Sequence, residues 1–124
     1  MNIVLQVVGG GSGGIASARR AALLGARVGL VESNHLGGTC VNLGCVPKKV
    51  MYYAADIRQE LVQDARDYGV EVQGQVVMNW GNLVERRDAY VKRLNDIYEK
   101  HLDNAGVEVI RGWGRFVGEK QVGF

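Results

Sequence analysis

A run of six residues, Gly9 to Gly14, contains five glycines and constrains the fold of this chain more than any other segment. It follows a short apolar stretch, residues 3–8, and opens an alanine-rich stretch, residues 13–24. A glycine-rich turn between a buried strand and a helix is typical of a βαβ unit, and residues 27–31 supply the second strand. The start of the chain is therefore predicted to adopt a parallel α/β fold.

Three glycines of this run have the spacing Gly9-x-Gly11-x-x-Gly14 of a dinucleotide-binding turn. Gly9 permits the tight turn, Gly11 the close approach of a pyrophosphate, and Gly14 the close packing of helix on strand. Free N–H groups at the start of the helix attract phosphate. Glu32, at the end of the second strand, can accept hydrogen bonds from ribose hydroxyls and would repel a 2′-phosphate, which favours FAD or NAD over NADP. A flexible glycine turn with an incidental acid is the alternative.

The only two cysteines, Cys40 and Cys45, lie five positions apart shortly after this unit. On a regular helix their α-carbons would be roughly 8–9 Å apart, whereas a disulfide rarely spans more than about 7 Å. A bond between them requires a break in the helix, which Gly44 can provide, and Pro47 suits the first turn of a helix that starts there. So small a ring stabilises a fold little, which favours an exchangeable disulfide over a structural one. Two independent buried thiols and half of a metal site are the alternatives, although neither histidine has ligand-like spacing.

The rest of the chain alternates helical and strand-like patterns. Apolar residues at helical spacing predict one helix after the cysteine segment, within residues 39–65, and another over residues 80–104. Glycines and β-branched residues over 68–77 predict an irregular connection between them. Residues 107–110 and 115–117 are predicted to be short strands. No repeat or linker interrupts the sequence, so one α/β domain is expected.

Composition excludes several classes of protein. A chain of 124 residues with 47% hydrophobic and 23% charged residues suits one domain with a modest core. Its net charge of +2 comes from interleaved acids and bases and gives no ground for nucleic-acid binding. No apolar run approaches the ~20 residues that cross a membrane, and the first residues lack the features of a signal peptide. We expect a cytoplasmic protein, and cysteine pairs in that compartment are more often catalytic than structural.

The segment Gly37–Lys49, taken with the glycine turn, resembles the flavin-dependent pyridine nucleotide–disulfide oxidoreductases, in particular the glutathione reductase branch. The resemblance extends to about Val117. Dihydrolipoamide dehydrogenases and mercuric reductases usually carry a serine after the proline, whereas Lys48-Lys49 is typical of glutathione and trypanothione reductases. The resemblance implies a Rossmann-like FAD-binding domain with a parallel sheet and long helices, of which residues 1–124 would form the amino-terminal, incomplete part. The NADPH-binding and interface domains of such homodimeric enzymes are expected to be absent from this sequence.

The resemblance also implies roles at a cofactor site. Cys40 and Cys45 would form a redox disulfide that receives two electrons from FAD, itself reduced by NADPH. Cys40 would attack glutathione disulfide, and Cys45, nearer the flavin, would resolve the mixed disulfide. Lys48 would lie beside the flavin N5 and favour negative charge on the reduced ring. The positions that match FAD contacts are Gly9, Gly11, Ser12, Gly13, Gly14, Glu32, Thr39, Cys40 and Lys48.

A substrate site follows from the same resemblance. Ala16 and Arg19 match positions that contact the glycine carboxylate of glutathione, and the charge of Arg19 suits an anionic peptide. Trypanothione reductases place an acidic or bulky residue there. Tyr90, Ile97 and Tyr98 match positions on the second long helix near the same pocket. From the pattern of residues alone, Arg19 would be a surface residue and both tyrosines would belong to the core.

Two functions are compatible with these observations. The chain would be the FAD and redox-disulfide portion of a glutathione reductase, or a stand-alone or inactive truncated FAD-binding module; a related enzyme such as a trypanothione reductase is a further alternative. We expect weak or no FAD binding and no NADPH oxidation by the isolated chain. Gln6 departs from the usual aliphatic residue of that strand, and burying its amide without partners would cost roughly 1–3 kcal/mol.

Overall fold

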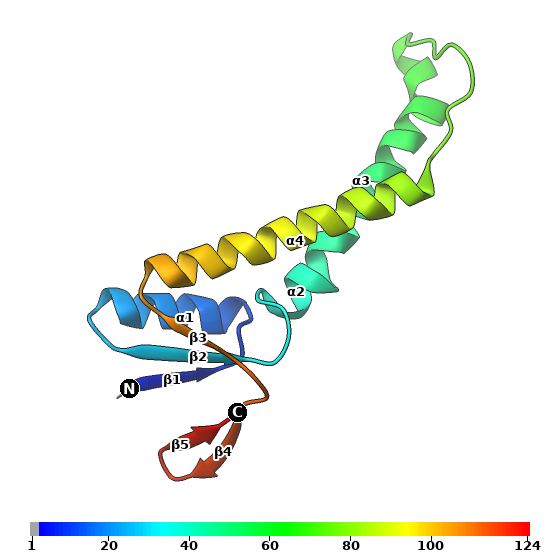
Figure 1. Ribbon diagram of the computed structural model, residues 1–124. Helices are drawn as coiled ribbons and strands as arrows, with labels where there is room; N and C mark the ends of the chain where they lie inside the picture. The colour runs from blue at the N-terminus through cyan, green and yellow to red at the C-terminus, as the bar shows by residue number, and fades with distance from the viewer. Residues whose placement is uncertain (1–2) are drawn as a thin grey trace.

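A computed structural model describes residues 3–124, and its centre is a three-stranded parallel sheet (Figure 1). Strands β1 (Leu5–Val8), β2 (Val28–Glu32) and β3 (Glu108–Arg111) lie in the order β1-β2-β3. Helix α1 (Ser12–Leu23) connects β1 to β2 and completes the βαβ unit. The predicted Rossmann-like α/β fold is confirmed, with strand ends shifted by one or two residues from those predicted.

Strand β2 is the centre of the sheet because it is hydrogen-bonded on both edges. Leu30 lies in register with Val7 of β1 and with Val109 of β3. Residues Val28 to Val31 are all buried, as expected for a parallel strand with a neighbour on each side. The end of β2 at Glu32 is thereby held rigidly next to the end of β1.

Strand β1 is more exposed than predicted. It pairs with β2 alone among the described residues, and the exposed fractions of Leu5 and Val8 are 38% and 50%. The prediction of a buried strand is wrong here because an apolar run does not reveal whether a strand is central or at an edge. Gln6 is exposed, so its amide reaches water and the expected cost of burying it does not arise.

The core lies between the sheet and one layer of helices formed by α1 and α4 (Trp80–Asn104) (Figure 1). Leu30, Leu36 and Leu102 are almost completely buried, and each such aliphatic side chain contributes about 1.5–3 kcal/mol. Leu102 comes from the last turn of α4, so burying it anchors that helix to the sheet. The buried members of the cluster are Ile15, Ala18, Val28, Leu30, Leu36, Leu102 and Val107.

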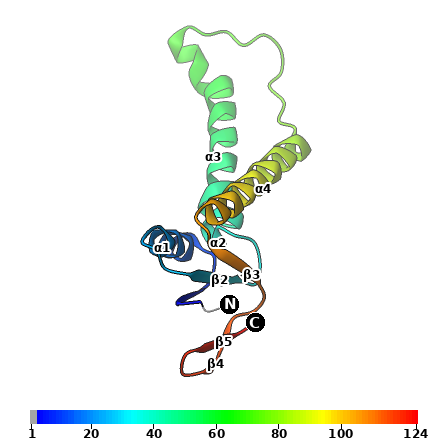
Figure 2. The ribbon, with the colours of Figure 1, turned by 60° about the vertical axis from the view of Figure 1, so that its left-hand side comes forward.

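Two long helices extend from the sheet as an arm. The short helix α2 (Gly38–Asn42) is followed by α3 (Cys45–Gln59) and by a π-turn (Glu60–Asp64) and a 3₁₀ turn (Ala65–Tyr68). Figure 2 shows α3 and α4 diverging from α2 towards the irregular segment that joins them, residues 69–79. The predicted helix after the cysteines and the predicted irregular connection are both confirmed.

Helix α4 has the bounds that its sequence pattern predicts, Trp80 to Asn104. The side chain of Asn79 caps its start by accepting a hydrogen bond from the Asn82 N–H at 3.0 Å. Gly106, with a φ of 71°, lies just beyond its end. Although α4 has 25 residues, neither it nor any other helix within residues 3–124 is apolar and long enough to cross a membrane.

The last residues form a two-stranded antiparallel hairpin of β4 (Arg115–Gly118) and β5 (Gln121–Gly123). The sequence predicts β4, but β5 was not anticipated because three residues are too short for a recognisable period. The hairpin lies on the opposite side of the sheet from α1 and α4 (Figure 1).

Replacing Leu102 with alanine is expected to lower the free energy of unfolding by about 2–5 kcal/mol, because the side chain is fully buried between α4 and the sheet. Leu23→Ala is the matched control, since 70% of Leu23 is exposed at the end of α1, and it should change the free energy by no more than about 0.5 kcal/mol. Urea unfolding followed by far-UV circular dichroism measures both. Equal stabilities of the two variants would show that α4 is not held by this core.

Candidate functional site

The turn between β1 and α1 requires glycine at two positions, Gly9 and Gly14. Gly9 has a φ of 102°, which glycine adopts without strain, and its N–H donates to the Val31 carbonyl at 2.8 Å. A Cβ added to Gly14 would overlap the carbonyl oxygen of Gly9 and lie 3.3 Å from Val7. The predicted roles of Gly9 in the turn and Gly14 in packing are in accord with this geometry.

The first turn of α1 is open to an anion. Gly11 occupies the cap position without any capping side chain, and no acidic residue lies in the first turn. A Cβ added to Gly13 would meet no atom within 4 Å, so the surface above the first turn, which includes Ser12, is free. Unsatisfied N–H groups and the positive end of the helix dipole make such a terminus suitable for a phosphate.

Glu32 is fixed by two backbone hydrogen bonds. Its Oε2 accepts from the Gly10 N–H at 2.6 Å, and its Oε1 accepts from the Asn34 N–H at 2.7 Å. Each carboxylate oxygen accepts more than one hydrogen bond, so both oxygens keep capacity for a ligand's hydroxyls. The sequence pattern did not single out Gly10. This residue is buried, and a Cβ added to it would lie 2.6 Å from the Leu36 side chain.

The glycine turn is joined directly to the cysteine segment. The Gly37 N–H donates to the Gly10 carbonyl at 2.7 Å, and Gly11 and Gly37 form a parallel β-bridge. Gly37 has a φ of 101° and is the cap residue of α2, the helix that carries Thr39 and Cys40. A hollow of about 250 Å³ begins beside Glu32 and ends beside this helix, and its walls are Glu32, Asn34, His35, Gly38, Thr39, Asn42 and Leu43.

The two cysteines lie on different helices, as the spacing requires. Helix α2 ends at Asn42, Leu43 and Gly44 interrupt the helical path, and α3 begins at Cys45. A Cβ on Gly44 would lie 3.0 Å from the Thr39 carbonyl oxygen and 3.3 Å from the Cys40 Cα, so the two helices meet at this glycine. Pro47 is in the first turn of α3, where a backbone N–H would have no partner within the helix, so the missing N–H of proline costs no hydrogen bond.

Both cysteines are free thiols and both are exposed. The structure therefore describes the dithiol form of the pair, and the disulfide stays a prediction. Hydrogen bonding to Cys45 raises the pKa of the Cys40 thiol, and desolvation adds to this, whereas the charge of Lys48 acts to lower it. The alternative of two buried thiols is wrong, and no group of three metal-ligating side chains occurs within residues 3–124.

Two asparagines that the sequence analysis did not single out connect the cysteine segment to α4. The Asn42 Nδ2 donates to the Gly38 carbonyl at 2.8 Å and to the Leu36 carbonyl at 3.2 Å. The Asn95 Nδ2 donates to the same Leu36 carbonyl at 2.7 Å and to the Asn42 Oδ1 at 3.0 Å. The signal that could have found Asn95 is its position, since it interrupts the apolar stripe of α4 one turn before Tyr98.

The residues predicted to contact a substrate lie on α1 and α4. Ala16 is exposed, while Arg19 is half-buried and its Nε is buried without a hydrogen-bond partner. On α4, Tyr90 is 43% exposed, and Tyr98 packs against the core cluster; Ile97 is half-buried. Tyr98 thus has the core role that its spacing indicates, whereas the same prediction is wrong for Tyr90, which is exposed. A shared substrate pocket for these residues stays a prediction.

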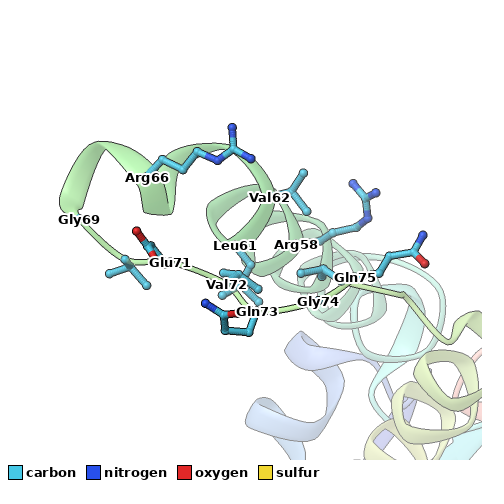
Figure 3. Close-up of a pocket in the computed structure, with 12 residues that line it drawn as sticks. Arg58, Leu61, Val62, Arg66, Gly69, Glu71, Val72, Gln73, Gly74 and Gln75 are labelled. Atoms are coloured by element: carbon cyan, nitrogen blue, oxygen red, sulfur yellow. The ribbon is translucent and has the colours of Figure 1, made fainter.

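A larger hollow, of about 690 Å³, lies at the far end of the arm (Figure 3). Arg58, Leu61, Val62 and Arg66 line it together with residues 69–76. Helix α1 and helix α2 lie well away from this end of the arm (Figure 1), and the glycine turn and Cys40 belong to those two elements. The size of a hollow therefore does not identify the site. The glycine turn, Glu32 and the cysteine segment lie near the ends of β1 and β2.

Comparisons with known proteins agree with this arrangement. The pattern of the family described as "Pyridine nucleotide-disulphide oxidoreductase" matches residues 4–123. The chain is 53% identical over 116 residues to a glutathione reductase of Debaryomyces hansenii, a match that covers 89% of the chain and 24% of the relative. It is 54% identical over 110 residues to a glutathione reductase of Yarrowia lipolytica, with 86% and 23% covered. The chain thus spans about a quarter of the length of these curated relatives.

Replacing Lys48 with glutamine is expected to slow the alkylation of Cys40 by iodoacetamide at neutral pH about two- to threefold. Lys48 lowers the pKa of Cys40, so its loss raises that pKa and reduces the reactive thiolate at a fixed pH. Lys49→Gln is the control, because Lys49 Nζ lies over the Tyr53 ring, 5.6 Å from its centre. Site-resolved mass spectrometry measures the rates, and an equal or larger loss in Lys49→Gln would contradict the assignment.

Proposed function

Because the chain belongs to the pyridine nucleotide–disulphide oxidoreductase family, we propose that it is the FAD-binding and redox-dithiol portion of a glutathione-disulfide reductase. The observation that carries the proposal is the direct bonding of the glycine turn to the cysteine segment through Gly10 and Gly37. A dinucleotide site and a cysteine pair that share backbone hydrogen bonds are suited to exchange electrons. Residues 1–124 would form the amino-terminal part of the FAD-binding domain.

The residues of the turn suit FAD in chemical type. The open start of α1, at Ser12 to Gly14, would hold the diphosphate, with Gly9 and Gly11 allowing its approach. Glu32, which keeps acceptor capacity on both oxygens, would bind the ribose hydroxyls. Thr39, Cys40 and Lys48 would face the flavin end. When bound, FAD supplies two-electron transfer from NADPH to the cysteine pair.

The cysteines perform thiol–disulfide exchange in this proposal. The Cys40 thiolate attacks one sulfur of glutathione disulfide, forms a mixed disulfide and releases one glutathione thiolate. The Cys45 thiolate then attacks the Cys40 sulfur, releases the second glutathione and leaves the Cys40–Cys45 disulfide. Because the pKa of the Cys40 thiol is raised in the dithiol form, a base must take its proton before attack at neutral pH.

The substrate preference rests on charge. Arg19 keeps a buried Nε without a partner, and a guanidinium binds carboxylates well. The positive charge of the Arg19 guanidinium would attract an anionic tripeptide disulfide near Arg19 and Ala16, whereas a cationic substrate would be repelled. We further propose that Tyr90, Ile97 and Tyr98 contribute to the substrate site of a homodimeric, cytoplasmic, NADPH-dependent enzyme that contains these residues.

Gly13→Ala is expected to weaken FAD binding about tenfold, because the added methyl group would stand over the first turn of α1 where the diphosphate is proposed to lie. The fold should persist, since that position is open. Gly81→Ala is the matched control, because Gly81 is likewise the second residue of a helix and lies far from the turn. Quenching of flavin fluorescence at high protein concentration measures the weak affinity we expect. Equal affinities of all three proteins, or a larger loss in Gly81→Ala than in Gly13→Ala, would contradict the proposed FAD site.

Cys45→Ser is expected to accumulate a mixed disulfide between Cys40 and glutathione when treated with glutathione disulfide, because no thiol is left to resolve it. The unaltered chain should instead lose two thiols and carry no bound glutathione. Intact-mass measurement with thiol counting distinguishes the products. If the unaltered chain keeps glutathione on its cysteines, Cys45 is not a resolving thiol and the proposed redox role fails.

A further inference from the structure

Helix α2 carries Cys40 but has little that could hold it in place by itself. It has five residues, Gly38–Asn42, and its cap residue Gly37 provides no side-chain hydrogen bond. Isolated helices of this length are unstable in water. Val41 is the one buried side chain of α2, and the backbone bonds of Gly37 fix only the residue before its first turn. Some other contact must therefore fix the direction of the Cys40 side chain.

The amides of Asn42 and Asn95 supply that contact. Asn42 lies two residues after Cys40 and three before Cys45, at the last residue of α2. Both hydrogens of its Nδ2 are used, on the carbonyls of Gly38 and Leu36, and its Oδ1 accepts from Asn95. Asn95 uses its second hydrogen on the Leu36 carbonyl. The Asn42 Nδ2 also lies 3.5 Å from the His35 carbonyl, so the two amides together bind three backbone carbonyls and one another.

The other end of this set is rigid. Leu36 is 1% exposed and belongs to the core, so its carbonyl is a fixed point beside the sheet. Asn95 is carried by α4, which the core holds through Leu102. The same helix contacts α3 through Arg87, whose Nη1 lies 3.6 Å from the Met51 Sδ. Helix α4 therefore contacts both helices that carry a cysteine, one on each side of Gly44.

We propose that Asn95, acting through Asn42, is a positioning residue that sets the alignment of the Cys40 and Cys45 sulfurs for disulfide formation. The inference rests on the proposed redox function of the pair. Closure of the ring removes two protons and two electrons from the thiols, and glutathione disulfide takes them up to give two molecules of glutathione. Misalignment of α2 lowers the effective concentration of one thiol at the other, so it shifts this equilibrium towards the open dithiol.

The test is the equilibrium between dithiol and disulfide in glutathione redox buffers, measured on the purified chain without flavin. Asn95→Leu keeps the side-chain size and removes both donors, and we expect the equilibrium constant for ring closure to fall about three- to tenfold. Asn82→Leu is the matched control on the same helix, since Asn82 is exposed and contacts Arg86; it should leave the constant unchanged.

A double variant separates positioning from general destabilisation. Because Asn95 acts through Asn42, Asn42→Ala should lower the constant, and adding Asn95→Leu to it should lower the constant little further. If the effects of Asn42→Ala and Asn95→Leu on the equilibrium constant for ring closure were additive in the double variant, the proposal would be overturned. Equal equilibrium constants for Asn95→Leu and Asn82→Leu would also overturn it. If Asn95→Leu shows no cooperative thermal transition, Asn95→Ser, which keeps a smaller polar side chain, replaces it under the same criteria.

The outcome also distinguishes this inference from the proposed function. If the unaltered chain forms no Cys40–Cys45 disulfide in any glutathione buffer, the redox function fails. If it forms the disulfide and Asn95→Leu forms it equally well, the redox function stands and the positioning role is refuted.

Discussion

The hydrogen bonds of Gly10 are the constraint on which the arrangement of the site depends. Its N–H is held by the carboxylate of Glu32 and its carbonyl by the N–H of Gly37. The first bond joins the glycine turn to the end of β2, and the second joins it to the start of the cysteine segment. A Cβ at Gly10 would lie 2.6 Å from the Leu36 Cδ2 and 3.1 Å from the Glu32 Oε2, so a side chain there would displace one or both of these groups. The glycine turn, the end of β2 and the cysteine segment are therefore joined to one another by direct hydrogen bonds.

The long helix α4 extends this rigidity to the cysteines. Its last turn is fixed in the core by Leu102, and its middle contacts the cysteine segment through Asn95. On the sheet side, Arg111 at the end of β3 pairs with Glu99 of α4 at 2.8 Å and donates to the Asn34 carbonyl at 3.1 Å. The loop after Glu32 is thus held by α4 and by β3. An exposed ion pair contributes little stability on its own, but here it also limits where the loop can move.

Sequence patterns predicted those parts of the structure that depend on local preference. The bounds of α4 followed from its apolar spacing and flanking cap residues, and the break between Cys40 and Cys45 followed from helix geometry and Gly44. The exposure of β1 could not be predicted, because it depends on which strands lie beside it. Gly10 was overlooked because the spacing of the motif does not require glycine there. Its role arises from Leu36 and Gly37, which are far along the chain.

Asn42 and Asn95 show the same limit for the chemistry of the site. Asn42 stands inside the cysteine segment, yet its partners include Asn95, 53 positions away. An asparagine has four hydrogen-bonding positions, and only a folded structure shows which of them are filled. The short helix α2 explains why such distant contacts matter: a helix of one turn keeps its orientation only through neighbours. A disulfide that must open and close needs sulfurs held close together without a permanent bond. Under the proposed role, the hydrogen bonds of Asn42 and Asn95 to the anchored helix α4 would provide that restraint, and both cysteines are exposed.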